Sequence, residues 1–190
     1  MTKKEARNLV NKCFANLSAK EKKNFDDRIL SNFIKFVDTN KYKKIGSYFS
    51  LHNEVNTAYL NDYLTKAGIQ IFFPKLPKDK NNKKLNFFKY LKTDKFTKNR
   101  FGILEPSKNM NPLDMNELDL ILVPFRAINK NLYRLGFGGG FYDNSLAEIN
   151  SNKCLGLGYE FQILDEFDIE PHDFKLGSLI TPEGYFKNAL

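Results

Sequence analysis

Two short apolar runs separated by one helical segment constrain the fold more than any other feature of this sequence. Residues 45–49 (Ile-Gly-Ser-Tyr-Phe) and 69–73 (Ile-Gln-Ile-Phe-Phe) have the length and composition of strands. Between them, Asn56 or Thr57 can cap a helix, and Gly68 can end it. Strand, helix and strand in close succession predict a right-handed crossover between two parallel strands. The chain is therefore expected to be an α/β protein whose functional edge lies at the turns that follow these strands.

Helical and strand patterns cover most of the remaining chain. Thr2 with Glu5, and Ser18 with Glu21, have the spacing of capping boxes in front of two amphipathic helices. The other expected elements are strands at residues 85–90, 118–123, 154–159 and 176–181, a helix at 141–149 and an irregular stretch at 92–116. We expect one domain over residues 1–190, with a three-layer α/β/α fold, a mostly parallel central sheet and two N-terminal helices.

Composition limits the class of protein. Hydrophobic residues make up 42% of the 190 residues and charged residues 27%, which is typical of a soluble globular chain. No apolar run reaches the roughly 18 residues that a membrane helix needs, so a cytoplasmic protein is expected. Cys13 and Cys154 form no CxxC pair, which gives little support to a disulfide framework or a cysteine metal site.

The charge of the chain leaves its partners open. The formal net charge of +8 suits phosphates, nucleic acid or polyanionic small molecules, and its sign does not choose among them. Much of the excess is lysine interleaved with asparagine, as in residues 78–84. We interpret that run first as a solvated loop.

A glycine-rich segment carries the clearest chemical signal. It consists of Arg134, Leu135, Gly136, Phe137, Gly138, Gly139, Gly140, Phe141, Tyr142 and Asp143. Exposed backbone N–H groups beside an expected helix start suit phosphate binding. The segment matches neither the dinucleotide fingerprint nor the P-loop, and its glycines could instead serve positive φ angles and close packing. Arg134 offers a phosphate-compatible fork and Asp143 a hard oxygen ligand for magnesium, which favours a functional interpretation.

This segment also resembles a known family. Residues 118–124 followed by 133–143 resemble the signature of 5-formyltetrahydrofolate cyclo-ligases, and other segments agree in order from Lys3 to about Thr181. The resemblance implies a reaction in which ATP phosphorylates the formyl oxygen of 5-formyltetrahydrofolate, N10 attacks the activated carbon, and phosphate leaves. It therefore implies an enzyme that uses ATP and magnesium and yields 5,10-methenyltetrahydrofolate and ADP.

The resemblance also implies roles for particular residues. By themselves, two basic residues on the first helix would more often be solvated, and an aromatic residue after a strand would more often be core. The implied roles are ATP binding by Lys3, Arg7 and residues 134–142; folate binding by Phe49, Glu54, Gly138, Gly139, Gly140, Phe141 and Tyr142; magnesium binding by Asp143 and Asp173; and catalysis by Arg134, Tyr142 and Asp143.

Departures from the family pattern keep other functions open. Asn129, Gly139, Asn144 and Gly177 stand where family members often carry charged residues, so weaker ATP binding, or binding of nucleotide or folate without turnover, is an alternative. A basic nucleic-acid-binding module, with Lys89, Tyr90 and Lys92 as one interleaved patch, ranks last because no nucleic-acid motif is present. We expect folate and ATP as partners, neither nucleic acid nor a membrane, and a monomer or weak homodimer.

Overall fold

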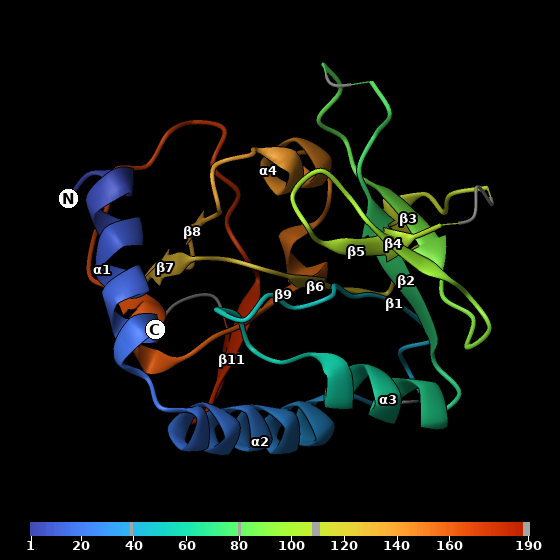
Figure 1. Cartoon of the computed structure of the whole chain (residues 1–190), viewed down its shortest axis with the longest axis horizontal. Helices are drawn as coiled ribbons and strands as arrows, with labels where there is room; N and C mark the ends of the chain where they lie inside the picture. The colour runs from blue at the N-terminus through green and yellow to red at the C-terminus, as the bar shows by residue number, and fades with distance from the viewer. Residues whose placement is uncertain (39, 80, 108–110, 188–190) are drawn as a thin grey trace.

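The computed structural model describes residues 1–38, 40–79, 81–107 and 111–187 (Figure 1). Its helices are α1 (Lys3–Asn16), α2 (Ala19–Phe36), α3 (Ala58–Lys66) and α4 (Phe141–Leu146), with 3₁₀ turns at Met115–Glu117, Ser151–Lys153 and Glu160–Gln162. Its strands are β1 (Lys44–Gly46), β2 (Gln70–Lys75), β3 (Asn86–Lys89), β4 (Phe96–Lys98), β5 (Leu104–Pro106), β6 (Leu120–Val123), β7 (Ala127–Asn129), β8 (Arg134–Leu135), β9 (Cys154–Leu157), β10 (Ile163–Leu164), β11 (Ser178–Thr181) and β12 (Gly184–Lys187).

A seven-stranded, mostly parallel sheet forms the centre of the molecule. Its strand order is β12-β11-β9-β6-β1-β2-β3, and only the two edge strands, β12 and β3, pair antiparallel. β1 pairs parallel with β2, and α3 lies between them in sequence, which confirms the parallel pair expected from the strand, helix and strand pattern. All four residues of β6 are buried, as expected for a parallel strand covered on both faces. Small sheets, β10-β7-β8 and β4-β5, complete the fold.

The two N-terminal helices begin where the capping signals place them. In α1 the side chain of Thr2 accepts from the Glu5 N–H while Glu5 reaches back to the Thr2 N–H, and Ser18 with Glu21 repeats this arrangement in α2. α2 and α3 cover one face of the sheet, and α4 lies on the other (Figure 1). Two large hydrophobic clusters fill the spaces between these layers. The mixed α/β class and the mostly parallel central sheet are therefore confirmed.

Several elements differ from the sequence expectation. The stretch expected to be irregular contains the β4-β5 hairpin, and its residues 108–110 lie outside the described residues. α4 ends at Leu146, earlier than expected, because the chain tightens there and the Ile149 N–H donates to the Leu146 carbonyl. β7, β8 and β10 are too short to give a periodic signal. Among the described helices, none combines the length and apolarity needed to cross a bilayer.

Candidate functional site

A cavity of about 360 Å³ lies at the carboxyl ends of β1, β2 and β6. The turns expected on the functional edge line it, and the glycine-rich segment forms the opposite wall. The lining residues are Tyr48, Phe49, Leu51 and Glu54 after β1; Pro74, Leu76 and Leu85 around β2 and β3; Asn99, Phe101, Ile103 and Leu104 in the β4-β5 hairpin; and Pro124, Arg134, Gly136, Phe137, Gly139, Gly140, Phe141, Tyr142 and Asp143. Ten of the sequence-predicted site residues thus share one cavity.

An aromatic cluster supports one wall of this cavity. The ring of Phe49 stacks on Phe73 with centroids 4.1 Å apart and planes inclined by 16°. It also meets Phe96 edge to face, with centroids 4.7 Å apart. Phe73 is fully buried, whereas Phe49 is half-buried and faces the cavity. Phe49 is therefore both part of the core and a flat apolar surface on which a ligand ring can stack.

Glu54 is a buried acid in this apolar setting. Its side chain accepts a hydrogen bond from the Leu51 N–H at 2.6 Å. Burial raises the pKa of Glu54 to about 7, although that hydrogen bond and the charge of Arg126 act in the opposite direction. Near neutral pH its carboxyl group can therefore take or release a proton, and the ionised form would accept strongly from ligand N–H groups.

Arg126 supports the turn that carries Glu54. Its guanidinium lies over the rings of Phe14 and Phe137, at 5.2 and 5.4 Å from their centroids, and donates to the Asn53 carbonyl at 3.1 Å. Only 6% of Arg126 is exposed. This residue links α1, the turn after β1 and the glycine-rich segment, a role that no sequence pattern indicates.

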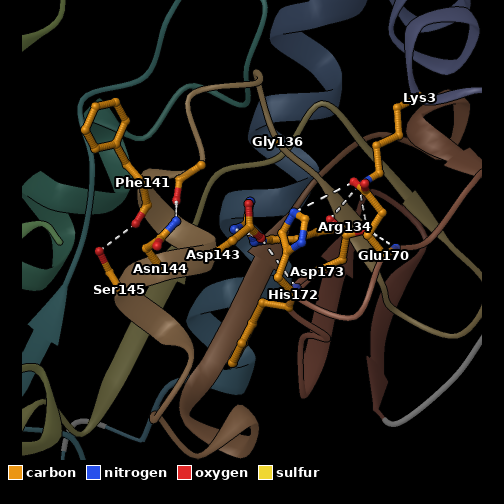
Figure 2. A network of polar contacts seen from close by, with 12 residues as sticks. Lys3, Arg134, Gly136, Phe141, Asp143, Asn144, Ser145, Glu170, His172 and Asp173 are labelled. Carbon is orange, nitrogen blue, oxygen red and sulfur yellow. Dashed lines mark hydrogen bonds and ion pairs between the residues drawn. The ribbon is translucent and has the colours of Figure 1, made fainter. Parts of the chain in front are cut away.

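A buried ion pair fixes the end of the glycine-rich segment. Arg134 is 2% exposed, and its Nη2 donates to Asp143 Oδ1 at 2.6 Å (Figure 2). The same oxygen accepts a longer bond of 3.4 Å from the Phe174 N–H. Burial lowers the pKa of Arg134, and the charge of Asp143 opposes that effect. Among the described residues, nothing bonds to the buried Arg134 Nε or the Tyr142 hydroxyl, so a ligand in the cavity would satisfy groups that are costly to leave unpaired.

The loop between β8 and α4 is shaped by its glycines and contacted by α1. Gly138 and Gly140 have φ angles of 103° and 70°, which residues other than glycine rarely adopt. Arg7 Nε donates to the Gly136 carbonyl at 2.9 Å, so one predicted ATP-binding residue does reach this loop. The Leu135 side chain instead packs with α1 in a hydrophobic cluster, which leaves only its backbone for a ligand.

Lys3 lies away from the glycine loop and is paired with acids near the C-terminus. Its ammonium donates to Asp173 Oδ1 at 2.8 Å, lies 2.7 Å from Oδ2, and also pairs with Glu170 (Figure 2). Burial disfavours the charge of Lys3, but the hydrogen bonds to Asp173 and Glu170 outweigh that effect and raise its pKa. A predicted ATP ligand and a predicted metal ligand therefore neutralise each other in this structure.

The two carboxylates predicted to bind magnesium differ in availability. Asp143 keeps one oxygen, Oδ2, without a hydrogen bond from any described residue, so it fits a hard cation. Both oxygens of Asp173 accept from Lys3, and Oδ2 also accepts from the Glu170 N–H, so Asp173 fits only if Lys3 moves away. Donor atoms of Glu170, His172 and Asp173 lie within 4.8 Å of one another, but Glu170 and His172 are exposed.

Gly177, at a position where the resemblance implies a further acid, is closed to any side chain. A Cβ built there would lie 2.3 Å from the Ser151 carbonyl oxygen and 2.7 Å from the Asn152 Cα. Both neighbours belong to the backbone, so neither can turn aside. The neutral residue at this position is therefore explained by packing against the 3₁₀ turn that precedes β9.

Sequence reasoning missed the part of the cavity wall that the β4-β5 hairpin supplies. Phe101 is 55% exposed, and the edge of its ring meets Phe141 at 6.0 Å between centroids. The signal that could have found this hairpin is Gly102, which adopts a φ of 75° in the connecting turn, preceded by Asn99, whose side chain accepts from two backbone N–H groups.

Comparisons with known proteins agree with this geometry. A model of the 5-formyltetrahydrofolate cyclo-ligase family matches residues 1–182. The chain is 31% identical to a 5-formyltetrahydrofolate cyclo-ligase of Haemophilus influenzae, over 94% of this chain and 97% of that protein. It is 30% identical to one from Escherichia coli over 73% of this chain and 77% of that protein.

Solved structures give the same result. The structure of a 5,10-methenyltetrahydrofolate synthetase from Aquifex aeolicus matches with a TM-score of 0.84 at 26% identity, covering 98% of this chain and 93% of that one. The corresponding protein from Mycoplasma pneumoniae matches with a TM-score of 0.76 at 26% identity, covering 96% and 99%. The cavity, the glycine-rich segment and these matches together show that this chain belongs to the 5-formyltetrahydrofolate cyclo-ligase family.

Proposed function

We propose that this protein catalyses the ATP-dependent cyclisation of 5-formyltetrahydrofolate to 5,10-methenyltetrahydrofolate. The formyl oxygen attacks the terminal phosphorus of ATP and ADP leaves; N10 then attacks the activated carbon and loses its proton, and phosphate leaves with the former formyl oxygen. The observation that carries this proposal is one cavity with an aromatic wall and a buried acid on one side and a glycine-rich anion cradle on the other. Membership of the cyclo-ligase family supports it.

The proposed folate half of the site is built on the turn after β1. Phe49 would stack on the pterin ring, and its own stack on Phe73 would hold it in place. Glu54 would accept hydrogen bonds from the pterin N–H donors. Gly138, Gly139, Gly140 and Phe141 would face the folate from the glycine side, and the unpaired Tyr142 hydroxyl would bond to its polar edge.

The proposed ATP half is built on the glycine-rich segment. Backbone N–H groups of residues 134–142 would bind phosphate oxygens, and Arg7, already on this loop, would supply charge. The free Nε of Arg134 would donate toward the transferred phosphoryl group. Lys3 would reach ATP by exchanging Asp173 and Glu170 for phosphate.

Catalysis would come mainly from positioning and charge compensation. Magnesium, when bound, would neutralise charge on the transferred phosphoryl group. Asp143 would hold it through Oδ2, and Asp173 would do so once released by Lys3. Arg134, Tyr142 and Asp143 would hold the formyl oxygen and the terminal phosphate in line.

The match over residues 1–182 supports one catalytic domain. A cytoplasmic location, a monomer or weak homodimer, and the absence of nucleic-acid partners stay predictions.

The direct test is to mix the purified protein with ATP, magnesium and 5-formyltetrahydrofolate and follow the near-ultraviolet absorbance of methenyltetrahydrofolate. We expect a signal that depends on ATP and on magnesium. Binding of both ligands without product would instead support a nucleotide- or folate-binding protein without turnover. Absence of any ATP-dependent signal would reject the enzyme assignment.

Glu54 gives a prediction for pH. Its pKa of about 7 in the folded protein exceeds the ordinary value of 4.5, so the ligand-free fold is favoured while the group is protonated. The contribution of Glu54 to the free energy of unfolding should be complete below about pH 4.5. It should fall by up to about 3 kcal/mol as the pH rises through 7. Folate binding should change the other way, because the ionised acid is the stronger acceptor. Urea unfolding and the KM for 5-formyltetrahydrofolate, measured from pH 5.5 to 8.5, test both trends.

Glu54→Gln isolates the contribution of this acid from every other titrating group. The variant keeps an oxygen that can accept from the Leu51 N–H. We expect the variant to lose the part of the pH dependence of stability that comes from Glu54. We also expect it to bind folate at least about tenfold more weakly at pH 8. Parallel pH profiles for the variant and the original protein would contradict the role assigned to Glu54.

A further inference from the structure

We propose that Lys83, in the loop between β2 and β3, is a further phosphate-binding residue. Its side chain reaches across the glycine-rich loop and binds the terminal phosphates of ATP. This inference rests on the proposed function, because it concerns the same nucleotide site. It adds a residue that lies far from the glycine-rich segment in sequence. The sequence alone indicates a solvated loop at residues 78–84, and the structure gives one member of that run a specific position.

The position of the Lys83 ammonium is the first observation. A Cβ built at Gly140 would lie 3.7 Å from Lys83 Nζ and 3.8 Å from its Cδ. The lysine side chain therefore crosses the loop at the glycine that precedes α4, at the rim of the cavity that Gly139 and Gly140 line. A phosphate bound by the backbone N–H groups of this loop would come within reach of that ammonium.

The charges around the loop are the second observation. Residues 135–140 carry no charged side chain. Arg134, at the start of the segment, is already paired with Asp143. Arg7 contacts the loop at Gly136, and Lys83 is the cation found beside its other end, at Gly140. Lys83 is exposed, and no carboxylate within the described parts of the chain pairs with it. It is thus a cation held beside an anion cradle with no anion of the protein to neutralise it.

The attachment of the β2-β3 loop is the third observation. The Leu85 N–H donates to Ser145 Oγ at 2.8 Å, and Ser145 Oγ in turn donates to the Phe141 carbonyl at 2.6 Å (Figure 2 shows the second of these bonds). Leu85 itself is buried. These bonds tie the chain two residues after Lys83 to α4, so the lysine stem starts from a fixed point next to the glycine loop.

Steric constraints explain why the charge comes from another segment. A Cβ at Gly139 would lie 2.9 Å from the Phe141 ring, and Gly138 and Gly140 have positive φ angles. A side chain within the loop would therefore disturb either the ring or the backbone. A lysine that reaches in from outside supplies charge without either disturbance, and its flexible stem can follow the phosphates as they enter.

The test is nucleotide binding by the full-length protein, measured by calorimetry with ATP, for Lys83→Met, Lys83→Arg and the matched control Lys84→Met. Lys84 neighbours Lys83, is also exposed, and supplies none of the atoms found nearest to a Cβ built at the loop glycines. We expect Lys83→Met to weaken ATP binding about tenfold and to make its decline with added salt shallower. Lys83→Arg should stay within about threefold, and Lys84→Met should be unchanged.

Binding as the readout separates this inference from the proposed function. Weakened ATP binding in Lys83→Met alone would support the role of Lys83 even if no methenyl product formed, an outcome that would reject only the cyclo-ligase reaction. The inference is overturned if Lys83→Met binds ATP as tightly as the original protein, if Lys84→Met loses as much affinity, or if the original protein binds no ATP. In an active enzyme, Lys83→Met should raise the KM for ATP and leave that for folate unchanged.

Discussion

Replacing Asp143 with asparagine is expected to lower the rate of methenyltetrahydrofolate formation by at least about 100-fold, because the proposed magnesium ligand and the charge partner of Arg134 are lost together. The variant is also expected to lose about 2–4 kcal/mol of stability. Removing one member of a buried ion pair leaves the other charge unpaired, and Arg134 is 2% exposed. The amide oxygen can still accept a hydrogen bond, which keeps the loss moderate.

Turnover at saturating ATP and folate, together with urea unfolding, would measure both effects of Asp143→Asn. Asp165→Asn serves as a matched control, since Asp165 is exposed and pairs with the exposed Lys130 on the surface. That control should change stability by less than about 0.5 kcal/mol. Full turnover of Asp143→Asn at limiting magnesium would contradict the role proposed for this carboxylate.

Gly177→Asp should destabilise the protein rather than strengthen its metal site. The new Cβ would lie 2.3 Å from the Ser151 carbonyl oxygen. The 3₁₀ turn at Ser151–Lys153 would therefore have to move away from the chain that enters β11. We expect a loss of about 3 kcal/mol or more, and a fall in the melting temperature of about 10 °C. Thermal unfolding and the magnesium dependence of turnover would be measured in parallel.

Gly177→Ala distinguishes packing from charge. Alanine adds only the Cβ that meets the backbone, so it should cause most of the same loss of stability. If Gly177→Asp kept its melting temperature and needed less magnesium, the packing explanation would be wrong. The position would then be a vacant part of the metal shell.

The sequence predicted the elements that have strong local signals. Capping boxes at Thr2 and Ser18 placed the starts of α1 and α2, because these bonds form within a single turn of helix. The parallel pairing of β1 and β2 followed from the intervening helix. β7 and β8 were not predicted, since strands of two or three residues have no measurable periodicity and depend on tertiary pairing.

The candidate site divides in the same way. Residues of the glycine-rich segment are consecutive, so their closeness in space follows from the sequence itself, although Leu135 and Gly138 do not line the cavity. Lys3 could be assigned to a helix but not to its partners, because Asp173 is 170 positions away. Arg126 and Lys83 carried no local signal at all. Their positions depend on how the turn after β1 and the β2-β3 loop fold against the glycine segment.

The position of tyrosines in the cavity gives the protein an optical property of its own. The chain contains nine tyrosines and no tryptophan, so its intrinsic ultraviolet fluorescence comes from tyrosine alone. Two of these residues, Tyr48 and Tyr142, line the cavity, where a pterin that absorbs in the near ultraviolet would accept their excitation energy. Quenching of the unlabelled protein is therefore expected to report when a pterin fills this cavity, before any bond is made.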